Sequence, residues 1–258
     1  MNVDEILERT QWDFFWVPDD TTVVDRPELL YVHCPRDVTY LNAVTRLRVA
    51  PAELEPIFAE LAEAHRDVES KIMVVPHTQS PALEDALVEA GYGLGDVHDA
   101  MAVETARFVP RETPEIVIRR VTTLAELDDA LRVTSAAFGR SLAVPPDQRA
   151  QTLADCSGES SRVVRITAYD AQSGEPLCAG GFTAFPELSF GLFWGGGTVP
   201  EGRGRGAYSA VVAARVALAR RRGLSRVGLY ARLATSAPIC ERQGFERHGR
   251  MSFWSRLP

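Results

Sequence analysis

The chain has 258 residues, 45% of them hydrophobic and 24% charged, and a formal net charge of −7 at pH 7. This composition excludes a disordered, collagen-like or coiled-coil chain, no apolar run approaches the ~18 residues of a membrane span, and the acidic charge argues against nucleic acid as a partner. The opening MNVDEILERTQW lacks the basic start and apolar stretch of a signal peptide. We therefore expect a cytoplasmic protein, monomeric or homodimeric, without a membrane or nucleic-acid partner.

The first half of the chain contains one regular stretch. KIMVVP (71–76) predicts a strand, SPALEDALVEAGY (80–92) a helix and HDAMAVE (98–104) a second strand. Two prolines and mixed charge follow and indicate a domain boundary. Since domains usually have ~100–200 residues, we expect two, at residues 1–108 and 109–258.

The second half alternates predicted strands and helices. Strands are predicted at residues 115–121, 162–170, 176–185, 187–199, 225–231 and 245–254, where the last segment forms one or two strands. Helices are predicted at residues 122–139, 147–156, 206–223 and 235–243. A meander joined to βαβ crossovers predicts an α/β protein, with an α+β mixed sheet covered by helices on both faces.

The segment before the predicted helix at 206–223 carries the clearest chemical signal. Glycines alternate with Arg203 and Arg205 there. Glycine lets a ligand approach the main chain, and the free N–H groups and partial positive charge of a helix start favour phosphate. Seven arginines and no acidic residue lie between 203 and 226, which indicates a small anionic ligand.

Two interpretations of this phosphate site remain open at this point. Gly202-x-Gly204-x-x-Ala207 fits the dinucleotide fingerprint GxGxxA, which expects an acidic residue ~20 positions further on. The sequence at 220–226 is RRRGLSR instead, so this alternative is an NADP-dependent enzyme. The cysteines and histidines have no metal-ligand spacing, so we expect no metal site.

The same segment also resembles the acyl-CoA loop of the GNAT superfamily of N-acyltransferases. The family pattern R/Q-x-x-G-x-G/A is matched at Arg203 and Gly206, with Tyr208 where a small residue is usual. SAPICERQGFE (236–246) resembles the second family signature, and the element order of 115–258 resembles the GNAT fold. Because the stretch 71–104 faintly repeats the end of the chain, the resemblance extends to two tandem GNAT-like domains, the first degenerate and lacking the glycine-arginine loop.

This resemblance implies an N-acetyltransferase that moves an acetyl group from acetyl-CoA (coenzyme A) to a primary amine of a small molecule or peptide. It implies cofactor binding by residues of the strand end, the loop and the second signature, namely Gly197, Thr198, Val199, Arg203, Gly204, Arg205, Gly206, Ala207, Tyr208 and Ser236. A backbone N–H at the strand end would polarise the thioester carbonyl.

The sequence departs from the family at the proton donor. The usual tyrosine is replaced by Cys240 and the usual asparagine by Leu233. We expect Cys240 to act as the acid, with Tyr230 or Tyr208 as alternative donors, and Glu187 to act as a base through water. The same departure suggests a second candidate function, a catalytically silent CoA-binding regulatory or interaction protein.

Overall fold

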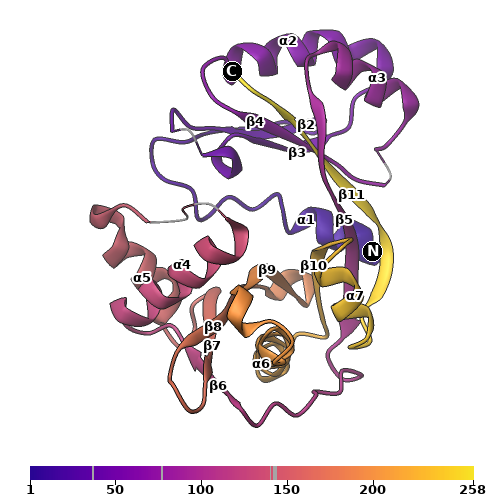
Figure 1. Ribbon diagram of the computed structural model, residues 1–258. Helices are drawn as coiled ribbons and strands as arrows, with labels where there is room; N and C mark the ends of the chain where they lie inside the picture. The colour runs from indigo at the N-terminus through magenta and orange to yellow at the C-terminus, as the bar shows by residue number, and fades with distance from the viewer. Residues whose placement is uncertain (37, 77, 140, 142–143) are drawn as a thin grey trace. The chain divides into compact units, whose positions relative to one another are not determined.

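The computed structural model describes residues 1–258 except residues 37, 77, 140 and 142–143 (Figure 1). The described α-helices are α1 (Val3–Arg9), α2 (Leu54–Ala64), α3 (Pro81–Glu89), α4 (Leu124–Phe138), α5 (Arg149–Ser157), α6 (Ala207–Arg221) and α7 (Ser236–Glu241). The described strands are β1 (Thr22–Asp25), β2 (Leu29–His33), β3 (Ala43–Leu47), β4 (Ser70–Val74), β5 (Gly93–Glu104), β6 (Ile116–Arg120), β7 (Val163–Asp170), β8 (Pro176–Phe185), β9 (Phe190–Thr198), β10 (Arg226–Arg232) and β11 (Glu246–Arg256). No helix in this described part of the chain has the length and apolar character needed to cross a membrane.

The chain forms two compact units that are not contiguous in the sequence. The first unit consists of residues 1–100, 231–237 and 248–258, and the second consists of residues 101–230 and 238–247. The expected division at residue 108 does not include this exchange of segments. Strand pairing explains it, because Ser252–Arg256 of β11 pair antiparallel with Ser70–Val74 of β4.

The first unit is built on the strand order β1-β2-β3-β4-β11. Helices α2 and α3 lie along one side of these strands (Figure 1). The core between them contains Leu29, Val44, Leu61 and Ile72, and Trp254 of β11 is part of the same buried cluster. The late strand therefore supplies core as well as hydrogen bonds to this unit.

The second unit is built on the strand order β10-β9-β8-β7-β6. The strands β6 to β9 form an antiparallel meander, and α6 connects β9 to the parallel strand β10. The central strand β8 is buried along all ten residues. This arrangement confirms the predicted mixed sheet.

Helices α4 and α6 cover opposite faces of the second unit's sheet (Figure 1). Successive residues of a strand point to opposite faces of the sheet, so two neighbouring glycines of β9 face the two different helices. A Cβ atom on Gly197 would lie 2.6 Å from Cβ of Ala137 on α4, and one on Gly196 would lie 3.1 Å from the ring of Tyr208 on α6. Helix α4 approaches β9 too closely for a side chain at Gly197, and a side chain at Gly196 would require the Tyr208 ring to shift.

The ends of α4 illustrate how local sequence sets the elements. The N–H of Glu126 donates to the hydroxyl of Thr123, and the Glu126 carboxylate accepts from the Thr123 N–H, which is a complete capping box. The helix ends at Gly139 with φ of +66°, a left-handed conformation that suits glycine. The structure confirms the helix predicted at residues 122–139 and shows that both of its ends are capped.

Candidate functional site

The strands β9 and β10 part soon after they begin. They pair in parallel only from Phe190 and Arg226 to Leu192 and Gly228. Beyond these residues the edge of β9 that faced β10 is open, while β8 stays paired to the other edge as far as Thr198. An open strand edge presents backbone N–H and C=O groups that need partners, so an extended ligand can bind along it.

A β-bulge interrupts β9 beside this open edge. Ala179 of β8 pairs with Gly197, and Gly181 pairs with Trp194, so β9 has one residue more than β8 between the two pairs. Gly195 in the bulge has φ of +58°, which glycine adopts without strain. Bulges re-aim the groups around them, so the glycine triplet changes the direction of the backbone groups at the open edge.

The ladder with β8 decides which N–H groups near the end of β9 are free. The N–H of Val199 donates to the carbonyl oxygen of Leu177 at 2.9 Å. Because N–H directions alternate along an antiparallel strand, the N–H of Thr198 points to the open edge. Among the three strand-end residues implied by the resemblance, Thr198 is therefore the one with a backbone donor aimed at a ligand there.

The loop after β9 forms an uncapped helix start. A 3-10 turn at Pro200–Gly202 leads into the loop, in which Gly204 and Gly206 have φ of +75° and +82°. Gly206 is the N-cap of α6, makes no side-chain cap, and is followed by a first turn without acidic residues. The first N–H groups of a helix have no partner within it, so this start favours an anion.

Most of the arginines from 203 to 226 have structural partners. The partnered residues are Arg205 with Asp170, Arg220 with the carbonyl oxygens of Thr105 and Phe108, Arg222 with those of Ser161 and Glu159, and Arg226 with Glu104. Arg203 is exposed at the loop, and its guanidinium has no hydrogen bond or ion pair to the side chain or main chain of any described residue. The positive charge left at the loop is thus much smaller than the sequence count suggested.

Asp170 at the end of β7 holds Arg205. Its carboxylate accepts the N–H groups of Ser173 and Gln172, each at 2.8 Å, and pairs with the Arg205 guanidinium. These contacts, the Ser173 hydrogen bond first, hold the pKa of Asp170 well below its usual value. They stabilise the fold above the usual carboxyl pKa and are lost as the pH falls towards the lowered one.

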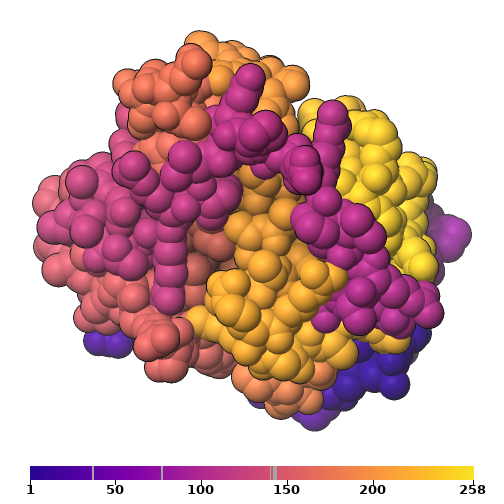
Figure 2. Space-filling model, turned by 90° about the horizontal axis from the view of Figure 1, so that it is seen from below, coloured from indigo at the N-terminus to yellow at the C-terminus, as the bar shows by residue number. Residues whose placement is uncertain are grey.

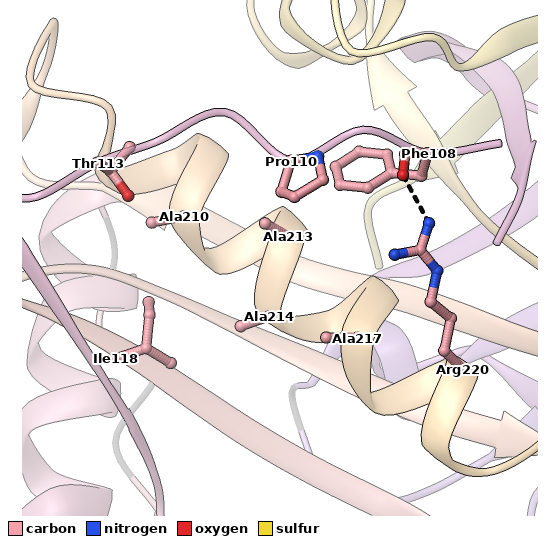
Figure 3. A pocket seen from close by; sticks show the side chains of 9 residues that line it. All are labelled: Phe108, Pro110, Thr113, Ile118, Ala210, Ala213, Ala214, Ala217 and Arg220. Carbon is pink, nitrogen blue, oxygen red and sulfur yellow. Dashed lines mark hydrogen bonds between the residues drawn. The ribbon is translucent and has the colours of Figure 1, made fainter. Parts of the chain in front are cut away.

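A segment before β6 covers the outer face of α6, as Figure 2 shows in magenta against orange. Phe108, Pro110 and Thr113 of this segment line a pocket of about 310 Å³ together with alanines of α6 (Figure 3). At its far end Arg220 donates to the carbonyl oxygen of Phe108 at 2.5 Å. The pocket is mostly apolar and lies on the face of α6 opposite Tyr208, so it is separate from the open edge of β9.

The sequence-predicted cofactor residues of the loop lie together around the start of α6. Ala207 is buried as the first residue of the helix and Tyr208 is partly buried as the second. Ser236 is placed differently, because it groups with the first unit and its hydroxyl accepts the N–H of Arg232 at 2.9 Å. The cofactor-binding roles themselves stay predictions.

The predicted catalytic residues are not all close together. Glu187 is exposed in the turn before β9, and the six residue-to-residue steps from Phe190 to Gly196 alone span about 20 Å of strand. Tyr230 lies on the part of β10 that no longer pairs with β9. Cys240 is fully buried, with its sulfur 3.9 Å from the hydroxyl oxygen of Tyr208. The structure thus brings Cys240 and Tyr208 together, and the three proposed roles stay predictions.

Arg215 is a functional candidate that sequence reasoning missed. Its side chain is 1% exposed, its Nη1 donates to the carbonyl oxygen of Gly181 at 3.1 Å, and its guanidinium lies 4.3 Å from the ring centre of Phe193. The sequence indicates that Arg215 is buried, because it lies four residues from both Val211 and Ala219 and therefore on the apolar face of α6. In the sequence, Arg215 is one of the seven arginines between residues 203 and 226.

Burial dominates the acid–base properties around Arg215. It raises the pKa of the Cys240 thiol to about 11, although the Arg215 cation opposes the shift. It also raises the pKa of the Tyr208 hydroxyl, with the same opposition from Arg215. Both groups therefore carry their protons at neutral pH, as a proton donor must.

The first unit repeats the parting strands without the glycine-arginine loop. The strands β3 and β4 pair in parallel only at Ala43–Val44 with Lys71–Ile72, and a pocket of about 290 Å³ lies near the start of α2. There the carboxylate of Glu53 accepts the N–H of Ala50 at 3.2 Å. An acidic group at this helix start disfavours phosphate, and the absence of a ligand from this half stays a prediction.

The sequence matches no protein-family model and no curated protein. Among solved structures, a GCN5-related N-acetyltransferase from Kribbella flavida is similar over 97% of this chain and 95% of its own, with a TM-score of 0.72 and 18% identity. One from Sphaerobacter thermophilus is similar over 91% and 82%, with a TM-score of 0.63 and 18% identity.

A tandem arrangement is found among the similar structures as well. A tandem GNAT protein from the clavulanic acid biosynthesis pathway is similar over 100% of this chain and 88% of its own, with a TM-score of 0.60 and 18% identity. The similarity thus covers both units and confirms the predicted fold. The chain has the GNAT fold.

Proposed function

We propose that the protein is an N-acetyltransferase that moves an acetyl group from acetyl-CoA to a primary amine of a small molecule or peptide. One observation carries the proposal: the open, bulged edge of β9 is followed, after the short loop at 199–206, by the uncapped start of α6. A thioester arm along the edge and a pyrophosphate at the helix start would follow one continuous path.

The chain's own groups fit such a ligand. The free N–H groups at the start of α6 and the exposed Arg203 guanidinium are suited to hold a pyrophosphate. The N–H of Thr198 at the open edge is suited to polarise a carbonyl oxygen. Acetyl-CoA would supply the activated acyl group as a thioester, and the protein would orient it and exclude water.

Calorimetry with CoA and acetyl-CoA tests the proposal, with NADP as the comparison ligand. We expect saturable binding of both CoA ligands in the micromolar range and none of NADP, since KM values of enzymes are typically about 1 μM to 1 mM. Absence of binding at millimolar CoA would end the proposal. Tighter binding of NADP than of CoA would favour the dinucleotide alternative instead.

A catalytically silent CoA-binding protein is a second candidate. Cys240 replaces the family's usual tyrosine proton donor, and its thiol is buried with its pKa raised to about 11. Release of free thiol from acetyl-CoA in the presence of an amine library distinguishes the two functions. Turnover above the rate without enzyme excludes the silent protein, and tight binding without turnover supports it.

Asp170→Asn is expected to tighten CoA binding several-fold. The substitution removes a negative charge from the loop and frees the Arg205 guanidinium for phosphate. Calorimetry at low salt measures the change, since such charge effects are screened as ionic strength rises. Glu175→Gln removes an exposed carboxylate from the same turn without touching Arg205, and should leave the affinity unchanged. Weaker binding by Asp170→Asn would show instead that Asp170 positions Arg205 for the ligand.

A further inference from the structure

The hydroxyl group of Tyr208 lies across the opening between β9 and the helix that follows β10. On the β9 side, its oxygen is 3.6 Å from the position that a Cβ atom on Gly196 would take. On the α7 side, it is 3.9 Å from the sulfur of Cys240. Gly196 belongs to the bulge of β9, so the hydroxyl lies against the backbone where a thioester at the open edge would react.

The Arg215 guanidinium lies beside this hydroxyl. Its Nη2 atom is 3.7 Å from the same Cβ position on Gly196, and it has no hydrogen-bond partner among the described residues. The other two guanidinium nitrogens are bonded to the carbonyl oxygens of Val211 and Gly181. The one unpartnered N–H donor group of this buried cation therefore lies at the bulge.

No carboxylate compensates the charge of Arg215 in the described structure. The titratable groups that act on Tyr208 are Arg215 on α6, Cys178 on β8 and Cys240 on α7. The two thiols have pKa values raised to about 11 by burial and are neutral at pH 7. Burial of a cation without a carboxylate partner is costly, so an anion that formed beside Arg215 would be stabilised by it.

We propose that Tyr208 gives its proton to the departing sulfur, and that Arg215 is a positioning residue that stabilises the resulting phenolate. This inference rests on the proposed acetyl transfer. In that reaction, the amine nitrogen forms a bond to the acyl carbon, and the carbon–sulfur bond breaks with its electron pair on sulfur. The sulfur takes the proton of the Tyr208 hydroxyl, and the phenolate regains the proton that the nitrogen loses. Nothing is oxidised or reduced.

The replacement of the family tyrosine by Cys240 fits this assignment. A cysteine on α7 is much smaller than a tyrosine, and the Tyr208 ring extends from α6 to within 3.9 Å of its sulfur. The hydroxyl group of Tyr208 on α6 thus takes the place of the hydroxyl group that a tyrosine on α7 would provide. This also explains why a tyrosine stands at the loop position where the family usually has a small residue.

Tyr208→Phe removes only the hydroxyl group and is the first test. With hydroxylamine as the amine and acetyl-CoA as the donor, we expect kcat to fall by about 10²–10⁴-fold, the usual contribution of a general acid, with little change in KM. Cys240→Ala should lower kcat less than Tyr208→Phe does. Tyr169→Phe removes a buried hydroxyl that bonds to Asp129 in the same unit, and controls for the loss of a structural tyrosine.

A binding measurement separates a chemical role from a structural one. Wild-type protein should bind CoA more tightly than desulfo-CoA, which lacks the thiol, because the sulfur contacts the Tyr208 hydroxyl. Tyr208→Phe and Arg215→Lys should reduce this preference while the affinity for desulfo-CoA is retained. Arg215→Lys keeps the charge, and its kcat should be reduced less than that of Tyr208→Phe. Its far-ultraviolet circular dichroism should match that of the wild type.

The outcomes distinguish this inference from the proposed function. If wild-type protein does not bind CoA, the proposed function itself fails. If it binds CoA and releases thiol with hydroxylamine, but Tyr208→Phe keeps full kcat and the full preference for CoA over desulfo-CoA, only the role of Tyr208 is overturned. Tight CoA binding by wild-type protein without thiol release would overturn the donor role and favour the silent CoA-binding protein.

Discussion

Replacing Gly206 with glutamate is expected to reduce the affinity for CoA by at least ~100-fold, or about 3 kcal/mol of binding free energy. A carboxylate at the N-cap would lie among the free N–H groups of α6 and repel the phosphates that the helix start favours. The side chain would also be strained. Gly206 has φ of +82°, and a Cβ atom there would lie 2.9 Å from Cγ2 of Thr113.

Gly206→Gln is the matched control, because it introduces the same strain and nearly the same volume without the charge. Both variants should lose thermal stability to a similar degree, since a residue with a Cβ atom costs roughly 1–2 kcal/mol in the left-handed region. Calorimetry should show a much larger loss of CoA affinity for the glutamate variant. Equal affinities in the two variants would mean that the phosphates do not lie at this helix start.

A chain that ends at Arg247 is expected not to fold cooperatively. It lacks the part of β11 that pairs with β4, together with the buried side chains of Met251 and Trp254. Loss of a large buried side chain costs about 2–5 kcal/mol, and the two losses together with the missing strand hydrogen bonds approach the 5–15 kcal/mol by which ~100–200-residue domains are stable.

Circular dichroism and thermal unfolding of the shortened chain provide the measurement. A chain that ends at Arg256 is the control, since the omitted Leu257 is 73% exposed, and it should unfold like the full chain. A cooperative transition of the 1–247 chain at the temperature of the full protein would show that the first unit does not need β11.

The sequence predicts those features of the fold that are determined by neighbouring residues in the chain. The capping box of Thr123 and Glu126 and the left-handed Gly139 lie within a few residues of the helix that they bound. The loop at Gly204 and Gly206 was recognised for the same reason, since its pattern and the helix that it starts are adjacent in the sequence.

The features that could not be predicted from the sequence depend on contacts between segments that are distant in the chain. The pairing of β11 with β4 joins residues about 180 positions apart. The sequence FERHGRMSFW predicts a strand but does not indicate which strand it pairs with. Asp170 neutralises Arg205 from 35 positions away, so a count of arginines overstated the charge at the loop. The burial of Arg215 and its approach to Tyr208 depend on how α6 packs against β8 and β9.

The strand β11 also reverses the usual order in which a protein acquires structure during synthesis. All residues of the second unit, 101–230 and 238–247, are made before residues 248–258, which the first unit requires. At ~5–20 residues per second, the ~150 residues after Ala100 take roughly 10–30 s to make. During that time the first unit has an unpaired edge on β4, a template for pairing with other chains. The amino-terminal unit is thus the later one to be completed, and factors that protect nascent chains should be needed there.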